Sequence, residues 1–306
     1  IGEGLKRGTT SSPDSLFGWQ VAAIGGLDGD GIADLAVTDV INGTLESDGG
    51  RRGAVHIVFQ NADGTVKKSV KIASGLNGGP TLQAEDYFGM SVTALGDLDG
   101  DGAMDLAVGA SGDGVGELSL GAVYIINLKP DGTAKKVTKI TSGLNGGPVL
   151  SASDEFGTSL ASLGDLDGDG IVDLVVGAGG TPAGGSGRGA IHVLFLQPNG
   201  TVKRSTLIEN NADWNWDVHD DDGFGTRIAA IGDVDGDGVV DLAALTARDY
   251  LDNGTVESFP SVIHILKMNQ DGTLNSAVKI TDGWNGGPSF QAIAAIWDLT
   301  SVGDTD

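Results

Sequence analysis

The chain has 306 residues, of which 40% are hydrophobic, so it has enough apolar side chains for a core and is expected to be globular rather than disordered. Its 42 acidic and 18 basic residues give a formal net charge of −24, which repels nucleic acid and anionic membranes and attracts cations. The absence of cysteine excludes disulfides and thiolate zinc sites, and no apolar run is long enough to span a bilayer. We therefore expect no nucleic-acid partner and no membrane insertion.

The sequence repeats itself with a period close to 68 residues. Phenylalanine opens four copies, at Phe17, Phe88, Phe156 and Phe224, and a partial fifth copy at Phe290. Each of the four contains short runs rich in β-branched residues and bounded by Gly, Asp and Asn, and we find no helical apolar period. Four strands per repeat predict an all-β fold, a β-propeller of four-stranded antiparallel blades.

The second copy illustrates the predicted strands of a blade. They cover Phe88–Leu95, Asp105–Ala110, Gly121–Leu128 and Thr133–Ile140. Between the third and fourth runs each copy has a Gly-Thr pair preceded by Asp or Asn, which suits a two-residue hairpin turn. The fourth run, outermost in a blade, carries a basic pair in three copies, and we interpret these pairs as protection against edge-to-edge association, with a binding patch as the alternative.

The ends of the sequence look like parts of one further blade. Ile1–Leu5 resembles the end of an outer strand, and Phe290–Asp306 resembles an inner strand with its loop. We treat residues 1–306 as a single propeller domain and expect it to be a fragment of a larger ring, with the blade number open.

An acidic loop of the pattern D-x-D-x-D-G-x-x-D follows the first strand of each copy. Four carboxylates this close repel one another unless a hard divalent cation binds them, and calcium accepts six to eight oxygens in loose geometry. A backbone carbonyl at the seventh loop position is the expected fifth ligand, and the alternative is an Asp-Gly-rich turn without metal. The predicted ligands of the three complete loops are Asp97, Asp99, Asp101, Ala103 and Asp105; Asp165, Asp167, Asp169, Ile171 and Asp173; and Asp233, Asp235, Asp237, Val239 and Asp241.

The first and fifth loops depart from this pattern. The first has Gly26 in place of the opening aspartate and keeps Asp28, Asp30 and Asp34, so we expect three strong calcium sites and one weaker site. The fifth lacks the middle acids and is expected to bind nothing.

These motifs resemble the FG-GAP repeat family, best known from the propeller of integrin α subunits. A Phe-Gly start, an acidic loop and a "GAVYI"-type third strand occur in this order. The "GAP" element is altered, reading Thr38-Asp39 in the first copy and Thr246-Ala247 in the fourth. The resemblance implies calcium at one face of the propeller and a ligand surface at the opposite face; it identifies a scaffold more than a function.

Two further groups of residues are functional candidates. His56, His192 and His264 share one repeat position in the third strand, where the second copy has Tyr124, so we interpret them as structural. A non-repetitive loop before the fourth copy, together with a later irregular loop, has aromatic and polar residues suited to sugar stacking, although burial between blades is the alternative. The candidate ligand-binding residues are Trp214, Trp216, Asp217, His219 and Tyr250.

The sequence therefore predicts a calcium-stabilised, non-catalytic adhesion or lectin-like module that recognises a glycan or a protein. We expect an extracellular or cell-surface, bacterial protein. The alternatives are a propeller module of a polysaccharide-degrading enzyme and a structural spacer in a large surface protein.

Overall fold

The computed structural model of the chain describes residues 15–41, 50–115, 118–182, 187–209, 218, 220–246 and 262–280. These residues form four antiparallel four-stranded sheets and one small hairpin, and they contain no helix. No helix in this part of the chain could therefore cross a membrane.

Each sheet corresponds to one sequence copy and is called a blade below, numbered in chain order. The first blade comprises β1 (Phe17–Ala23), β2 (Leu35–Asp39), β3 (Ala54–Gln60) and β4 (Val66–Ala73). The second comprises β5 (Phe88–Gly96), β6 (Asp105–Ala110), β9 (Ala122–Leu128) and β10 (Ala134–Ile140). The third comprises β11 (Phe156–Gly164), β12 (Asp173–Ala178), β13 (Ala190–Leu196) and β14 (Val202–Glu209), and the fourth comprises β15 (Arg227–Gly232), β16 (Asp241–Thr246), β17 (Val262–Met268) and β18 (Leu274–Ile280).

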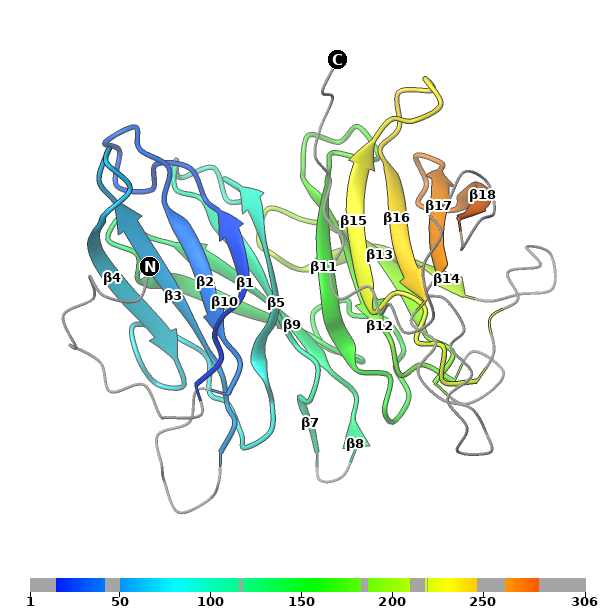
Figure 1. Cartoon of the computed structure of the whole chain (residues 1–306), viewed down its shortest axis with the longest axis horizontal. Helices are drawn as coiled ribbons and strands as arrows, with labels where there is room; N and C mark the ends of the chain where they lie inside the picture. Colours follow the sequence, from blue (N-terminus) through cyan, green and yellow to red (C-terminus); the bar gives the residue numbers. More distant parts are fainter. Residues whose placement is uncertain are drawn as a thin grey trace, which may run out of the picture.

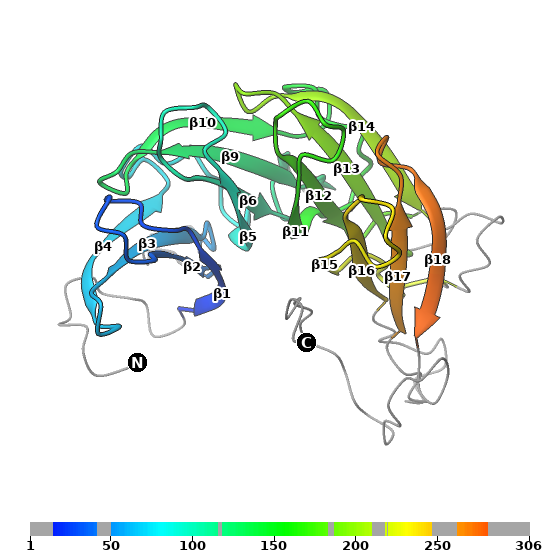
Figure 2. The ribbon, with the colours of Figure 1, turned by 90° about the horizontal axis from the view of Figure 1, so that it is seen from above.

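The blades stand side by side along an arc. Figure 2 shows β5, β11 and β15 on the inner side of the arc and β10, β14 and β18 on its outer side. Neighbouring blades contact each other chiefly through the first strand of each blade, which lies on this inner side. Apolar side chains from adjoining blades form shared buried clusters. The all-β propeller architecture predicted from the repeats is thereby confirmed. That residues 1–306 form a single propeller stays a prediction, since the terminal segments lie outside the described residues.

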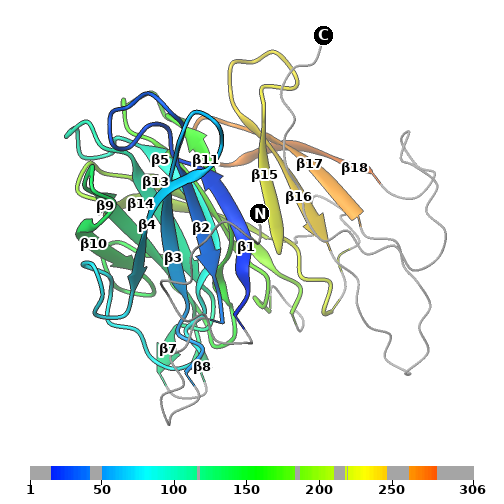
Figure 3. The ribbon, with the colours of Figure 1, turned by 60° about the vertical axis from the view of Figure 1, so that its left-hand side comes forward.

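The strand boundaries of the second copy agree with the predicted ones to within one residue. The hairpin of β7 (Gly114–Val115) and β8 (Leu118–Ser119), within the β6–β9 connection, was not predicted from the sequence. Because consecutive strands are antiparallel, this connection and the β5–β6 loop leave opposite ends of the blade. Figures 1 and 3 show β7 and β8 at the lower end and the β1–β2 and β15–β16 loops at the upper end.

The Phe-Gly pair that opens each copy holds neighbouring blades together. Phe88, Phe156 and Phe224 are fully buried, and each forms a parallel bridge with a glycine of the preceding blade. Phe17 is 46% exposed, because the described residues include no blade before the first. The opening phenylalanine is thus buried only where a preceding blade packs against it.

A second interlock uses the glycine after the phenylalanine. The carbonyl of Gly157 accepts a hydrogen bond of 2.7 Å from Ser91 Oγ in the second blade. A Cβ placed on Gly109 of that blade would lie 2.0 Å from the same carbonyl oxygen, a distance that no side chain can take. Ser159, Gly177 and Gly225 repeat the arrangement between the third and fourth blades. Close backbone approach therefore explains the glycine of the "GAP" element.

The fourth blade does not present this surface. Its strand register aligns Leu245 with Gly109, so the sequence alignment of the fourth "GAP" element at Thr246-Ala247 was wrong by one residue. Arg227 stands where the second blade has Ser91. A following blade could not pack here by the same glycine contact.

The repeated third-strand position is structural, as predicted. His56, His192 and His264 are at least nine-tenths buried, and Tyr124 occupies the same place in the second blade. Each ring meets the opening phenylalanine of its own copy edge-on, with centroids 5.2 to 5.5 Å apart. These residues complete the aromatic packing of each blade.

Candidate metal centre

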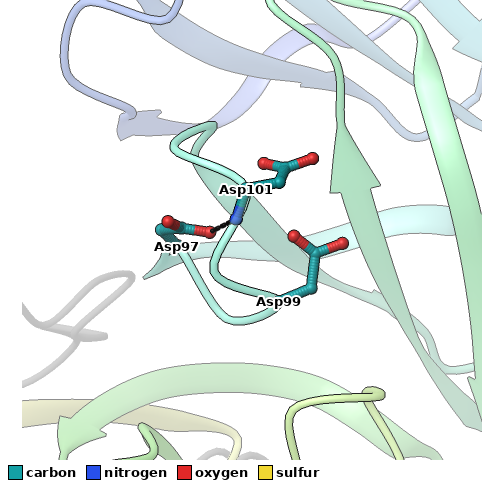
Figure 4. A group of neighbouring side chains, drawn as sticks. All are labelled: Asp97, Asp99 and Asp101. Atoms are coloured by element: carbon teal, nitrogen blue, oxygen red, sulfur yellow. Dashed lines mark hydrogen bonds between the residues drawn. The ribbon is translucent and has the colours of Figure 1, made fainter.

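The acidic loops connect the first and second strands of each blade, and their first aspartate shapes the turn. In the second blade, Asp97 accepts hydrogen bonds from the backbone N–H groups of Asp101 (2.9 Å) and Gly102 (2.7 Å). Asp165 and Asp233 make the same contacts in the third and fourth blades. These bonds wrap the chain tightly around one carboxylate, as Figure 4 shows for Asp97.

The ninth loop position ties the loop to the sheet. Asp105 is fully buried and accepts hydrogen bonds from the backbone N–H of Leu98 (2.9 Å) at the start of the loop and of Leu128 (3.1 Å) at the end of the third strand. Asp34, Asp173 and Asp241 do the same in their blades. Sequence reasoning assigned these four only as metal ligands and missed their role as cross-strand ties.

Among the described residues, three clusters of carboxylates are each close enough to share one cation. Asp97, Asp99 and Asp101 form the first, drawn in Figure 4, and the other two are Asp165, Asp167 and Asp173, and Asp233, Asp235 and Asp241. Within each cluster one oxygen atom from every residue lies within 4.8 Å of the others. All nine residues come from the predicted ligand set.

The clusters fit a hard divalent cation on two grounds. Their donors are all carboxylate oxygens, which calcium and magnesium prefer. In addition, Asp99 Oδ1 and Asp167 Oδ1 are buried oxygen atoms that no protein donor satisfies. A buried acceptor without a partner is costly, and a bound cation would satisfy it. Ligation by the backbone carbonyls of Ala103, Ile171 and Val239 stays a prediction.

The first loop differs, as its sequence predicts. Gly26 offers no carboxylate, so the N–H of Gly29 bonds to the Gly26 carbonyl at 3.2 Å instead. Asp28, Asp30 and Asp34 do not gather into a cluster of the kind found in the other three described loops. Weak cation binding at this loop remains the expectation.

Lysines of the outer strand reach the acidic loop of their own blade. Lys135 Nζ lies 2.9 Å from Asp99 Oδ2 and 2.5 Å from Asp101 Oδ2. This ammonium group lowers the pKa of Asp101 below its usual value, and the two carboxylates raise the pKa of Lys135. The interpretation of these lysines as edge protection alone did not foresee the contact.

Burial has the opposite effect on the pKa of two ninth-position carboxylates, Asp105 and Asp173. Loss of solvent raises the pKa of Asp173 to about 6 and raises that of Asp105. The charged form that a cation requires is thus disfavoured at these positions in the metal-free loop. A bound divalent ion would reverse this preference.

The candidate ligand-face residues Trp214, Trp216, Asp217, His219 and Tyr250 lie outside the described residues. The strands on either side show only that the β14–β15 connection leaves the end of the blades opposite the acidic loops. Their grouping into a binding surface stays a prediction.

Repeated four-stranded blades, each with an acidic loop between its first two strands, define a β-propeller with candidate cation-binding loops. A family model described as FG-GAP repeat matches residues 88–126 and 156–194, which are the second and third blades. Together with the integrin relatives described next, this match supports an FG-GAP β-propeller family for the chain.

Curated relatives include two integrin α subunits from Xenopus laevis. Integrin alpha-5 is 34% identical over 209 residues, which cover 65% of this chain and 19% of the integrin. Integrin alpha-4 is 34% identical over 164 residues, which cover 54% of this chain and 14% of the integrin. Phosphatidylinositol-glycan-specific phospholipase D of Rattus norvegicus is 32% identical over 222 residues, or 70% and 24%. The chain thus spans less than a quarter of the length of these relatives, which include both integrin subunits and a phospholipase.

Two rhamnogalacturonan lyases are among the similar solved structures. The exotype lyase YesX is 16% identical with a TM-score of 0.33, covering 87% of this chain and 51% of its own, and the Bacillus licheniformis lyase PL11 is 17% identical with the same score, covering 84% and 44%. Similarity at this level carries no conclusion about chemistry.

Proposed function

We propose that this chain is a calcium-stabilised recognition module without catalytic activity of its own, whose ligand is a protein or a glycan. The observation that carries the proposal is the set of three carboxylate clusters on equivalent loops of a propeller whose relatives include integrin α subunits. Millimolar extracellular calcium would saturate even weak sites of this type, which favours an extracellular or cell-surface location.

Calcium would act by neutralising carboxylates that also hold the strands in place. Asp105 bonds to both the loop and the third strand, so an ion bound to it would couple the first three strands of the blade. The ligand surface would then be the opposite end of the blades, where the irregular connections leave the sheets. Loops of variable sequence on a rigid scaffold are the usual place for recognition.

Calcium titration by isothermal calorimetry tests the metal sites. We expect about three tight equivalents for the unaltered chain and one fewer for Asp101→Ala. Asp131→Ala is the matched control, because Asp131 is an exposed aspartate in the β9–β10 turn, outside the acidic loops. An unchanged stoichiometry in Asp101→Ala, or no calcium binding at all, would contradict the assignment.

A glycan array probed with the purified chain, first in calcium and then in chelator, tests the recognition function. Binding that is lost with Trp216→Ala would support a lectin-like module. A blank array in calcium would redirect the proposal to a protein ligand.

A second candidate function is a propeller module within a larger enzyme. The similarity to a phospholipase D over 70% of this chain favours it. Recombinant chain alone should then show no hydrolytic activity, while fusion to the catalytic part should change the substrate affinity of that part.

A further inference from the structure

In the first three blades, a lysine of the outer strand contacts the acidic loop of the same blade. Lys67, Lys135 and Lys203 occupy the same position of the outer strand, the second residue of β4, β10 and β14. Each places its Nζ between the third- and fifth-position carboxylates of the loop, 34 to 39 residues away in sequence. The shorter contact of each lysine measures 2.8, 2.5 and 2.7 Å, respectively.

The fourth blade lacks this ammonium group. The pairing of Leu274 with Met268 corresponds to that of Val202 with Leu196, so Asn275 stands where the third blade has Lys203. A different lysine, Lys267 of β17, lies 3.4 Å from Asp235 alone. That separation is longer than the shorter contact of any outer-strand lysine and involves one carboxylate instead of two.

An ammonium group and a divalent cation compete for the same oxygens. In the second blade Asp99 and Asp101 belong to the carboxylate cluster, and both also contact Lys135. A metal ion in this cluster would have to displace the lysine from its oxygens or accept a like charge a few ångströms away, and either event lowers affinity. Lysine suits such an exchange because its charge sits on a flexible four-carbon stem, and this side chain is 42% exposed.

We propose that Lys67, Lys135 and Lys203 are built-in counter-ions that neutralise the metal-free loops and compete with the divalent cation. The inference rests on the proposed calcium function. It orders the loops: the fourth binds calcium most tightly, the second and third more weakly, and the first most weakly because it also lacks the opening aspartate. The lysines thereby let the first three blades keep their fold at calcium concentrations that leave only the fourth loop filled.

The test isolates one loop at a time. A chain carrying Asp167→Ala and Asp235→Ala keeps the second loop as the one complete carboxylate cluster among the described residues. Adding Lys135→Met to that chain should raise calcium affinity about fivefold to tenfold by calorimetry, because a competing charge is removed while the apolar stem stays. In chelator the same substitution should lower Tm, since the carboxylates lose their counter-ion.

The neighbouring lysine provides the matched control. Lys136 Nζ bonds to the backbone carbonyl of Asn199 in the next blade at 2.6 Å and to no carboxylate of the acidic loop. Lys136→Met should therefore leave calcium affinity unchanged. The reciprocal change, Asn275→Lys, should weaken calcium binding at the fourth loop and raise Tm in chelator.

The outcomes separate this inference from the proposed function. If the parent chain binds calcium and Lys135→Met leaves its affinity unchanged or weaker, the competition is refuted while the calcium sites stand. If neither the unaltered chain nor any variant binds calcium, both are refuted. Should Lys135→Met fail to fold, Lys203→Met in a chain carrying Asp101→Ala and Asp235→Ala tests the third loop. A smaller gain in affinity is expected there, because Arg204 Nη2 still lies 3.4 Å from Asp167 Oδ2.

Discussion

The interlock between the second and third blades makes a quantitative prediction for Gly109→Ala. The new Cβ would lie 2.0 Å from the Gly157 carbonyl oxygen and 2.2 Å from Ser91 Oγ, whereas real Cβ atoms stay at least 3.0 Å from such neighbours. The blades must therefore separate by about 1 Å, since the Gly157 carbonyl is backbone and cannot rotate away.

The cost of that separation has two parts. Overpacking of a close-packed interior costs about 1–3 kcal/mol. The buried hydrogen bond from Ser91 to Gly157 would also be stretched or lost, at about 1–3 kcal/mol. A total near 4 kcal/mol corresponds to a fall in Tm of roughly 6 °C for a chain of this size.

Thermal and urea unfolding followed by circular dichroism measure this loss. Gly177→Ala should give the same loss, because its Cβ would lie 2.0 Å from the Gly225 carbonyl oxygen. Gly143→Ala is the control: it has positive φ but no atom within 4 Å of its added Cβ, so it reports backbone strain alone, about 1 kcal/mol. If Gly109→Ala unfolds at the same temperature as Gly143→Ala, close approach of the blades does not require this glycine.

Two further predictions concern buried titratable groups. Burial lowers the pKa of His192 to about 4, so its contribution to stability is complete above the unfolded value near 6.5 and is lost as the pH falls from there toward 4. His192→Leu should therefore flatten the dependence of unfolding free energy on pH between pH 7 and pH 4.5 by about 2 kcal/mol in chelator. Profiles that stay parallel would contradict this. Tyr124 donates a hydrogen bond of 2.5 Å to Asp113, which Lys139 also contacts at 2.6 Å. Tyr124→Phe should cost about 1–3 kcal/mol in urea unfolding at pH 7, because this buried carboxylate loses one donor, and an unchanged midpoint would show that the bond contributes nothing.

The repeat pattern could be interpreted from the sequence because its signals are local. Strands of β-branched residues, Asp-Gly turns and carboxylates at alternate positions each depend on residues a few positions apart. That is why the predicted strands of the second copy agree with the structure to within one residue and why the predicted acidic loops supply all three carboxylate clusters. The structural role of the third-strand histidines followed from their recurrence at one repeat position.

Other features depend on residues that only folding brings together. Lys135 and Asp101 are 34 positions apart and meet because the outer strand returns past the loop of its own blade. Asp105 ties the loop to β9, and Gly109 touches Gly157 of the next blade, so their roles are set by neighbours distant in sequence. Local composition determined the blade and its acidic loop, whereas blade-to-blade packing and strand return decided which charges pair and which glycines have no room for a side chain.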